Sequence, residues 1–311
     1  MSPVKIMTNL MNASYITSAI CSLLILPTVT QAENIFVSGY SSPQVTWFSP
    51  LGSPLGTYVS TGIAPGNTNL VFDASGNLYV SINANWTIRK FSPTGIDLGV
   101  FTTQGVQAPW GLAVNSANTL YVANANAGTP SITFYDSSGN LTGTLTSPGL
   151  ITPIGITFDS SDNLYVADET AGNIRKFSAA GTDLGVFASG FNHPTDVAIN
   201  SAGNVYIVNS NANSVDIYNA TGTFISSLTS PNFDRPQTLA FDDNGYLYVV
   251  NALNDTISKF SPALDDLGVF ASTGVTGSGG IAIYYPLPEP SSFAMLLGAG
   301  ALVTAISRRR R

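Results

Sequence analysis

A four-residue motif returns six times along the chain at an almost constant spacing. An apolar residue, an aromatic residue and a β-branched residue follow its first position in every copy. The copies begin at Asn34, Asn77, Thr119, Asn163, Asn204 and Tyr246, between 41 and 44 residues apart. A fixed period of this length indicates a repeat architecture, in which each repeat forms one structural unit.

Each repeat reads as four short strands separated by polar turns. In the fourth repeat, the strands are predicted at 155–158, 164–167, 173–177 and 184–187, where apolar and polar residues alternate or run in short apolar stretches. Charged residues make up only 9% of the chain, while glycine and proline are frequent, as expected of many tight turns. Four strands per repeat predict the all-β fold of a six-bladed β-propeller, with four antiparallel strands in each blade.

The two ends of the repeat region predict how the ring closes. The first repeat begins with its second strand, and an extra strand at 280–285 follows the last repeat. This extra strand matches the pattern of the first strand in the other repeats. We expect it to complete the N-terminal blade, so that no blade has an open inner edge.

Family resemblance rests on two motifs that flank the first and second strands. Pro109-Trp-Gly-Leu and Pro153-Ile-Gly-Ile precede or begin first strands, and Asn163-Leu-Tyr-Val-Ala-Asp ends a second strand. These motifs resemble NHL repeats, and they are similar to gluconolactonase-like and strictosidine-synthase-like propellers. The resemblance implies the fold, and it says little about the function, because one fold serves many functions.

Residues 1–32 have the pattern of a secretory signal peptide. One lysine, a short apolar run and the small-residue stretch that ends at Ala32 follow one another, which predicts cleavage after Ala32 by signal peptidase. An N-terminal membrane anchor is the alternative.

Residues 287–311 combine three features in a fixed order. Pro288, Glu289 and Pro290 come first, an apolar stretch at 293–306 follows, and Arg308, Arg309, Arg310 and Arg311 end the chain. This order is similar to the PEP-CTERM sorting signal of Gram-negative bacteria. The resemblance implies processing by an exosortase, transient membrane contact through a helical tail, an extracellular or cell-surface location, and an association with exopolysaccharide and biofilm matrix. An ordinary C-terminal membrane anchor is the alternative. The predicted propeller domain is therefore 33–286.

Charge and cysteine content exclude two classes of protein. Between residues 33 and 290, six basic residues stand against eighteen acidic ones, so the domain lacks the basic surface that nucleic acids require. Cys21 is the only cysteine, and a disulfide framework is therefore excluded.

A metal site is one candidate for chemistry. Gluconolactonase-like relatives are implied to hold a divalent metal with Glu, Asn and Asp, whereas Glu169 is the only glutamate within the repeats here. A series of Asx residues follows the second strands: Asn83, Asn124, Asp168, Asn209 and Asn251. Their oxygens suit Ca²⁺. The alternative is that they bond the backbone of the turn that follows.

A binding rim is the other candidate. The loops that share one face of a propeller contain Trp86, Trp110, Phe191, His193, Phe233 and Arg235, together with Tyr40 and Asp234. Aromatic rings beside amides and charges predict contacts with sugar rings. The alternative is that these residues pack between blades. His193 is the only histidine, so a pair of histidine zinc ligands and a recognisable Ser–His–Asp arrangement are both missing.

These features favour a secreted, non-catalytic propeller that binds exopolysaccharide or another surface protein. The alternative is a lactonase- or lyase-like enzyme with a weak divalent-metal site in the central channel.

Overall fold

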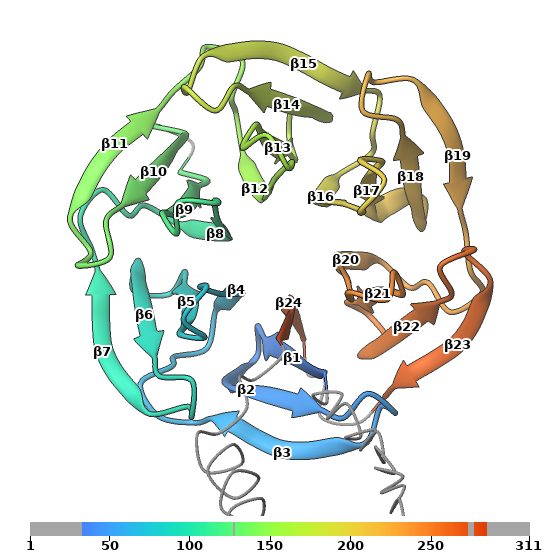
Figure 1. Cartoon of the computed structure of the whole chain (residues 1–311), viewed down its shortest axis with the longest axis horizontal. Helices are drawn as coiled ribbons and strands as arrows, with labels where there is room; N and C mark the ends of the chain where they lie inside the picture. Colours follow the sequence, from blue (N-terminus) through green and yellow to red (C-terminus); the bar gives the residue numbers. More distant parts are fainter. Residues whose placement is uncertain (1–32, 127, 273–276, 285–311) are drawn as a thin grey trace, which may run out of the picture. The chain divides into compact units, whose positions relative to one another are not determined.

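The computed structural model describes residues 33–126, 128–272 and 277–284. They form six antiparallel sheets of four strands each, which we number as blades 1 to 6. The sheets stand around a central axis (Figure 1). The predicted six-bladed propeller is confirmed.

The strands of the first three blades follow the predicted order from the axis outward. Blade 1 contains β24 (Ser278–Tyr284), β1 (Asn34–Gly39), β2 (Ser42–Phe48) and β3 (Pro54–Val59). Blade 2 contains β4 (Asn67–Phe72), β5 (Leu78–Ile82), β6 (Thr87–Phe91) and β7 (Asp97–Thr102). Blade 3 contains β8 (Pro109–Val114), β9 (Leu120–Asn124), β10 (Ser131–Tyr135) and β11 (Leu141–Leu145).

The other three blades repeat this arrangement. Blade 4 contains β12 (Pro153–Phe158), β13 (Leu164–Asp168), β14 (Asn173–Phe177) and β15 (Asp183–Ser189). Blade 5 contains β16 (Pro194–Ile199), β17 (Val205–Asn209), β18 (Ser214–Tyr218) and β19 (Phe224–Leu228). Blade 6 contains β20 (Pro236–Phe241), β21 (Leu247–Asn251), β22 (Thr256–Phe260) and β23 (Asp266–Ala271).

Helix is confined to one short turn in the described part of the chain, the 3₁₀ helix η1 (Ser210–Ala212). Across those same residues, no helix has the length and apolar character needed to cross a membrane. The predicted signal peptide and sorting tail lie outside the described residues.

The ring closes through the strand that the sequence predicted for this role. β24 pairs antiparallel with β1, so that Ile283 lies opposite Ile35 and Ile281 opposite Val37. The backbone N–H of Gly280 also donates to the Ser38 hydroxyl at 2.8 Å. The last strand of the repeat region is therefore the innermost strand of blade 1, which ties both ends of the domain into one sheet.

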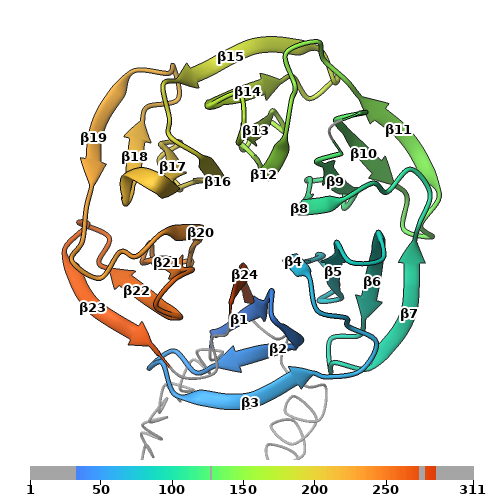
Figure 2. The ribbon, with the colours of Figure 1, turned by 180° about the vertical axis from the view of Figure 1, so that it is seen from behind.

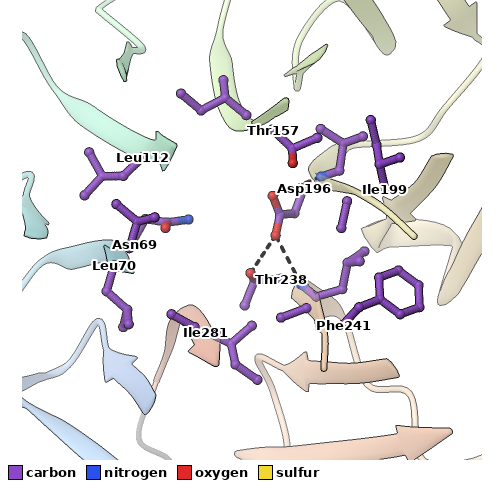
Figure 3. Close-up of a pocket in the computed structure, with 16 residues that line it drawn as sticks. Asn69, Leu70, Leu112, Thr157, Asp196, Ile199, Thr238, Phe241 and Ile281 are labelled. Carbon is purple, nitrogen blue, oxygen red and sulfur yellow. Dashed lines mark hydrogen bonds between the residues drawn. The ribbon is translucent and has the colours of Figure 1, made fainter. Parts of the chain in front are cut away.

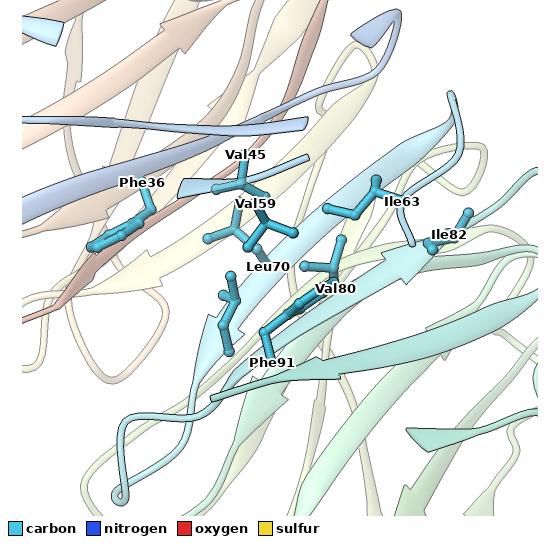
Figure 4. Close-up of a cluster of buried hydrophobic side chains, with 9 residues drawn as sticks. Phe36, Val45, Val59, Ile63, Leu70, Val80, Ile82 and Phe91 are labelled. Atoms are coloured by element: carbon cyan, nitrogen blue, oxygen red, sulfur yellow. The ribbon is translucent and has the colours of Figure 1, made fainter. Parts of the chain in front are cut away.

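The core lies between the blades rather than inside any one of them. Leu78 and Val80 in β5 pack towards blade 1, whereas Tyr79, on the other side of the same strand, packs towards blade 3. Because side chains alternate along a strand, each second strand is covered on both faces. Six such clusters fill the six boundaries, and Figure 4 shows the one between blades 1 and 2.

Candidate functional site

The innermost strands of all six blades surround the axis of the propeller (Figure 2). A cavity of about 260 Å³ lies between them, and its lining comes from β4, β8, β12, β16, β20 and β24. Most of its lining side chains are aliphatic, because the innermost strands carry apolar residues at most positions. We call this space the channel cavity.

One carboxylate lies in the channel cavity. Asp196 in β16 is only 7% exposed, and it is the one acidic side chain among the described residues that line the cavity. Its Oδ2 accepts hydrogen bonds from the Thr238 hydroxyl at 2.6 Å and the Leu239 N–H at 3.1 Å, both in blade 6. Its Oδ1 accepts from the Val197 N–H at 2.9 Å. Burial raises the pKa of Asp196 to about 6, although its hydrogen bonds oppose the shift.

Glycine makes room for this side chain. A Cβ atom on Gly155, in the neighbouring strand β12, would lie 2.5 Å from Asp196 Oδ1. Figure 3 shows Asp196 and Asn69 pointing into the channel from different sides. The third position of the innermost strands thus holds only small or polar residues: Asn69, Gly111, Gly155, Asp196, Thr238 and Gly280.

Asp196 was not predicted as a site residue, although the sequence held a signal for it. It is followed by three apolar residues in its strand, and it stands at a position where three other innermost strands have glycine before an aliphatic residue. An acidic residue there conflicts with the repeat pattern, and such conflicts often mark functional positions.

A second cavity, of about 320 Å³, opens at one end of the ring. It is lined by Tyr40, Trp110, Glu169, His193, Arg235, Gln237, Ala252 and Gly277. These residues belong to the turns and strand ends near the axis in blades 1, 3, 4, 5 and 6. We call this space the mouth cavity. It brings together Trp110, His193 and Arg235 from the predicted binding rim.

Two aromatic rings form one side of the mouth cavity. Tyr40, in the turn between β1 and β2, and Trp110, in β8, stack with their ring centroids 6.1 Å apart and their planes 14° apart. Tyr40 is 44% exposed. The pair comes from blades 1 and 3, so its spacing depends on the closed ring.

A close contact between a histidine and a carboxylate stands among the other lining groups. His193 Nε2 lies 2.8 Å from Glu169 Oε1, and both side chains are partly exposed. His193 Nδ1 is buried and has no hydrogen-bond partner among the described residues. The backbone of His193 is left-handed, with φ of 66°, and its carbonyl accepts from the Ser210 N–H at 3.1 Å. The sequence showed both residues without indicating that they meet.

Three of the predicted rim residues lie elsewhere. Phe191 and Phe233 are 8% and 6% exposed and belong to the clusters between blades, as the alternative interpretation of the rim expected. Phe233, for example, packs edge-on against Phe260 in the same blade. Trp86 is 45% exposed, but it does not line the mouth cavity.

The predicted Asx series divides into two groups. Asn124, Asp168, Asn209 and Asn251 end equivalent second strands and pair with the first residue of the innermost strand. Asn83 lies one residue beyond this position, because β5 ends at Ile82. All four equivalent residues are buried.

Each of the four equivalent residues holds the loop that enters its own blade. Asn124 accepts from the Gln107 N–H at 2.9 Å, and Asn209 accepts from the Asn192 N–H at 2.8 Å. Asp168 accepts from Ile151 at 2.6 Å and from Thr152 at 2.8 Å. Their oxygens are thus engaged by backbone N–H groups. In the described ranges, no three His, Cys, Asp or Glu side chains gather to hold a metal, and Ca²⁺ at the Asx series stays a prediction.

Comparison with known proteins identifies the fold. No protein-family model and no curated protein matches the chain. The structure is similar to a chain of a nidogen/laminin complex, with a TM-score of 0.70 and 17% identity over 81% of this chain and 98% of that one. It is also similar to a protein of unknown function from Bacteroides caccae, with a TM-score of 0.66 and 12% identity over 81% and 98%.

A further similar structure is a catalytically inactive virginiamycin B lyase from Staphylococcus aureus with quinupristin. Its TM-score is 0.61, with 13% identity over 83% of this chain and 94% of that one. At these identities, the likeness concerns the fold alone, and both binding proteins and a lyase share it.

Proposed function

We propose that the chain is an exported propeller that binds a saccharide of the extracellular matrix at the mouth cavity. The observation that carries the proposal is the stacked Tyr40–Trp110 pair beside Arg235, Gln237 and the His193–Glu169 pair.

The chemistry of the mouth cavity suits a sugar. Aromatic faces contact the apolar face of a sugar ring, while a few convergent polar groups fix its orientation. Gln237 offers both an amide donor and an acceptor, and Arg235 offers donors only. A volume of about 320 Å³ is at the small end of ligand sites.

A binding measurement tests this proposal. Calorimetric titration of the full-length chain with matrix oligosaccharides should give binding that Trp110→Ala weakens at least tenfold, since hot-spot aromatics contribute about 2 kcal/mol or more. Trp86→Ala is the matched control, because Trp86 is exposed but does not line the cavity. Equal binding by Trp110→Ala and the wild type would reject the mouth cavity as the site.

Export and sorting are the second part of the proposal. The sequence of residues 1–32 and the order of features in 288–311 support signal-peptide cleavage and exosortase processing. N-terminal sequencing of the exported protein should begin at Glu33, and deletion of 288–311 should abolish surface display in the source bacterium. An intact N-terminus, or unchanged display after the deletion, would contradict the respective assignment.

Asp196 supports a second candidate function, a lactonase- or lyase-like activity in the channel. A carboxyl group whose pKa is raised to about 6 by burial titrates near neutral pH, as a general base requires. Turnover of lactones by the full-length chain, lost in Asp196→Asn and dependent on a divalent metal, would support this candidate. Absence of turnover with and without added metal would reject it.

A further inference from the structure

Arg235 differs from the other arginines in the described residues. Arg89 and Arg175 form ion pairs with Asp97 and Asp183 across neighbouring strands of their own blades, at 2.5 Å and 2.6 Å. Arg235 is exposed, and its guanidinium makes no hydrogen bond or ion pair with any described residue. It is therefore an uncompensated cation at the mouth cavity of a domain with a large excess of acidic residues.

The backbone holds Arg235 in this place. Its N–H donates to Asn213 Oδ1 at 2.8 Å, and its carbonyl accepts from the Ala252 N–H at 3.0 Å. Its φ is 54°, in the left-handed region that non-glycine residues adopt at a cost of about 1 kcal/mol or more. The backbone thus places Arg235 at the cavity, and the exposed side chain carries the guanidinium.

The acidic group at the mouth cavity does not neutralise Arg235. Glu169 pairs with His193 at 2.8 Å, so its carboxylate already has a partner. Asp234 precedes Arg235 in the sequence, yet it forms no ion pair with it. The guanidinium therefore keeps its donors available for a ligand.

We propose that the sugar bound at the mouth cavity is a terminal uronic acid residue and that Arg235 binds its carboxylate. This inference rests on the proposed saccharide binding. The planar fork of a guanidinium matches a carboxylate in bidentate geometry, and the Tyr40–Trp110 pair lies at the same cavity to contact the ring. The volume of about 320 Å³ has room for a sugar residue at a chain end.

The test compares acidic and neutral sugars of equal length. The full-length chain is titrated with disaccharides that end in glucuronic, galacturonic or mannuronic acid and with the matching neutral hexose disaccharides. We expect at least one acidic probe to bind about 10- to 100-fold more tightly than its neutral match, as a charge-assisted pair requires. This difference should shrink as salt is added.

Variants of Arg235 test whether this residue causes the difference in affinity between acidic and neutral probes. Arg235→Met should reduce the affinity for the acidic probe to that for the neutral one, while Arg235→Lys should recover part of the preference, because it restores the charge without the planar fork. Circular dichroism and thermal unfolding of both variants establish that they fold. An unchanged preference in folded Arg235→Met would overturn the assignment, and so would equal binding of a sulfated disaccharide.

Failure of this inference and failure of the proposed function give different results. If acidic and neutral probes bind equally and Trp110→Ala weakens both, saccharide binding stands and the uronic acid assignment is overturned. If neither probe binds the wild type, both are overturned.

Discussion

Asp196 offers the sharpest test of the physical interpretation of the channel. Its pKa rises from 3.8 to about 6 through burial, so the folded protein holds a proton between these two pH values that the unfolded chain has already released. The free energy of unfolding therefore falls as the pH rises through this window. Since one pKa unit corresponds to about 1.4 kcal/mol, the loss caused by this one group is about 3 kcal/mol.

Asp196→Asn removes the titration and keeps the shape of the side chain. Its amide oxygen can still accept from Thr238 and Leu239, which donate to the Asp196 carboxylate. The new NH₂ group changes the free energy of unfolding of the variant by an amount that does not depend on pH. Urea unfolding of both proteins at pH 3.5 and 7.5 therefore isolates the charge. The stability of the variant relative to the wild type should increase by about 3 kcal/mol between the two pH values.

The opposite or a null result would refute the interpretation. Other carboxyl groups titrate in the same range, but they are common to both proteins and cancel in the difference. A relative stability that does not change with pH would mean that the channel solvates the Asp196 carboxylate or holds a cation beside it. A relative stability that decreases with pH would mean that a cation stabilises the charged form.

Three further predictions concern the scaffold. Gly111→Ala should lower the free energy of unfolding in urea by about 3 kcal/mol, because its Cβ would lie 2.0 Å from the Ile154 carbonyl oxygen. The control Gly128→Ala should change it by no more than about 0.5 kcal/mol, because the nearest atom to its Cβ would lie at 3.5 Å. Ala108→Gly should raise the stability by about 1 kcal/mol, since Ala108 has φ of 48°; a loss in urea unfolding would contradict this. The hydrogen bond from Arg175 lowers the pKa of Asp183 to about 2. The wild type should therefore have a higher thermal stability than Asp183→Asn at pH 7, and this difference should disappear as the pH falls from 3.8 through 2. A constant difference between these two proteins would contradict the assignment.

The fold was predictable because every repeat shows the same pattern of apolar strands and polar turns. The second strands read as apolar runs, and Leu78, Tyr79 and Val80 show why: their side chains are buried against a neighbouring blade on either side. The closing strand was predictable for the same reason, since β24 carries the pattern that the first repeat lacks. Five nearly equal spacings between six copies of the motif indicated the same architecture independently.

The site was predictable only in part, because the predicted rim combined residues from different positions of the repeat. Trp110, in β8, lines the mouth cavity, whereas Phe191 and Phe233, from the loops before β16 and β20, are buried between blades. Position in the repeat separates these outcomes: Trp110 directly follows Pro109, whereas both phenylalanines lie three residues before a proline, where other repeats also bury an apolar residue. The offset of Asn83 was visible in the sequence, since Asn83 lies six residues after the start of its motif and the other four Asx residues lie five after theirs, and strand pairing agrees.

Departures from the repeat are where the chemistry of this propeller lies. Ala108, His193 and Arg235 precede equivalent prolines, and all three have a left-handed backbone. Since alanine adopts it as well, the conformation belongs to the scaffold and not to the histidine or arginine side chain. Asp196 likewise stands where three other blades have glycine. The blades are similar to one another, so a residue that departs from their common pattern without a structural reason is a candidate for ligand binding. Arg235, charged and without a partner among the described residues, meets this condition most fully.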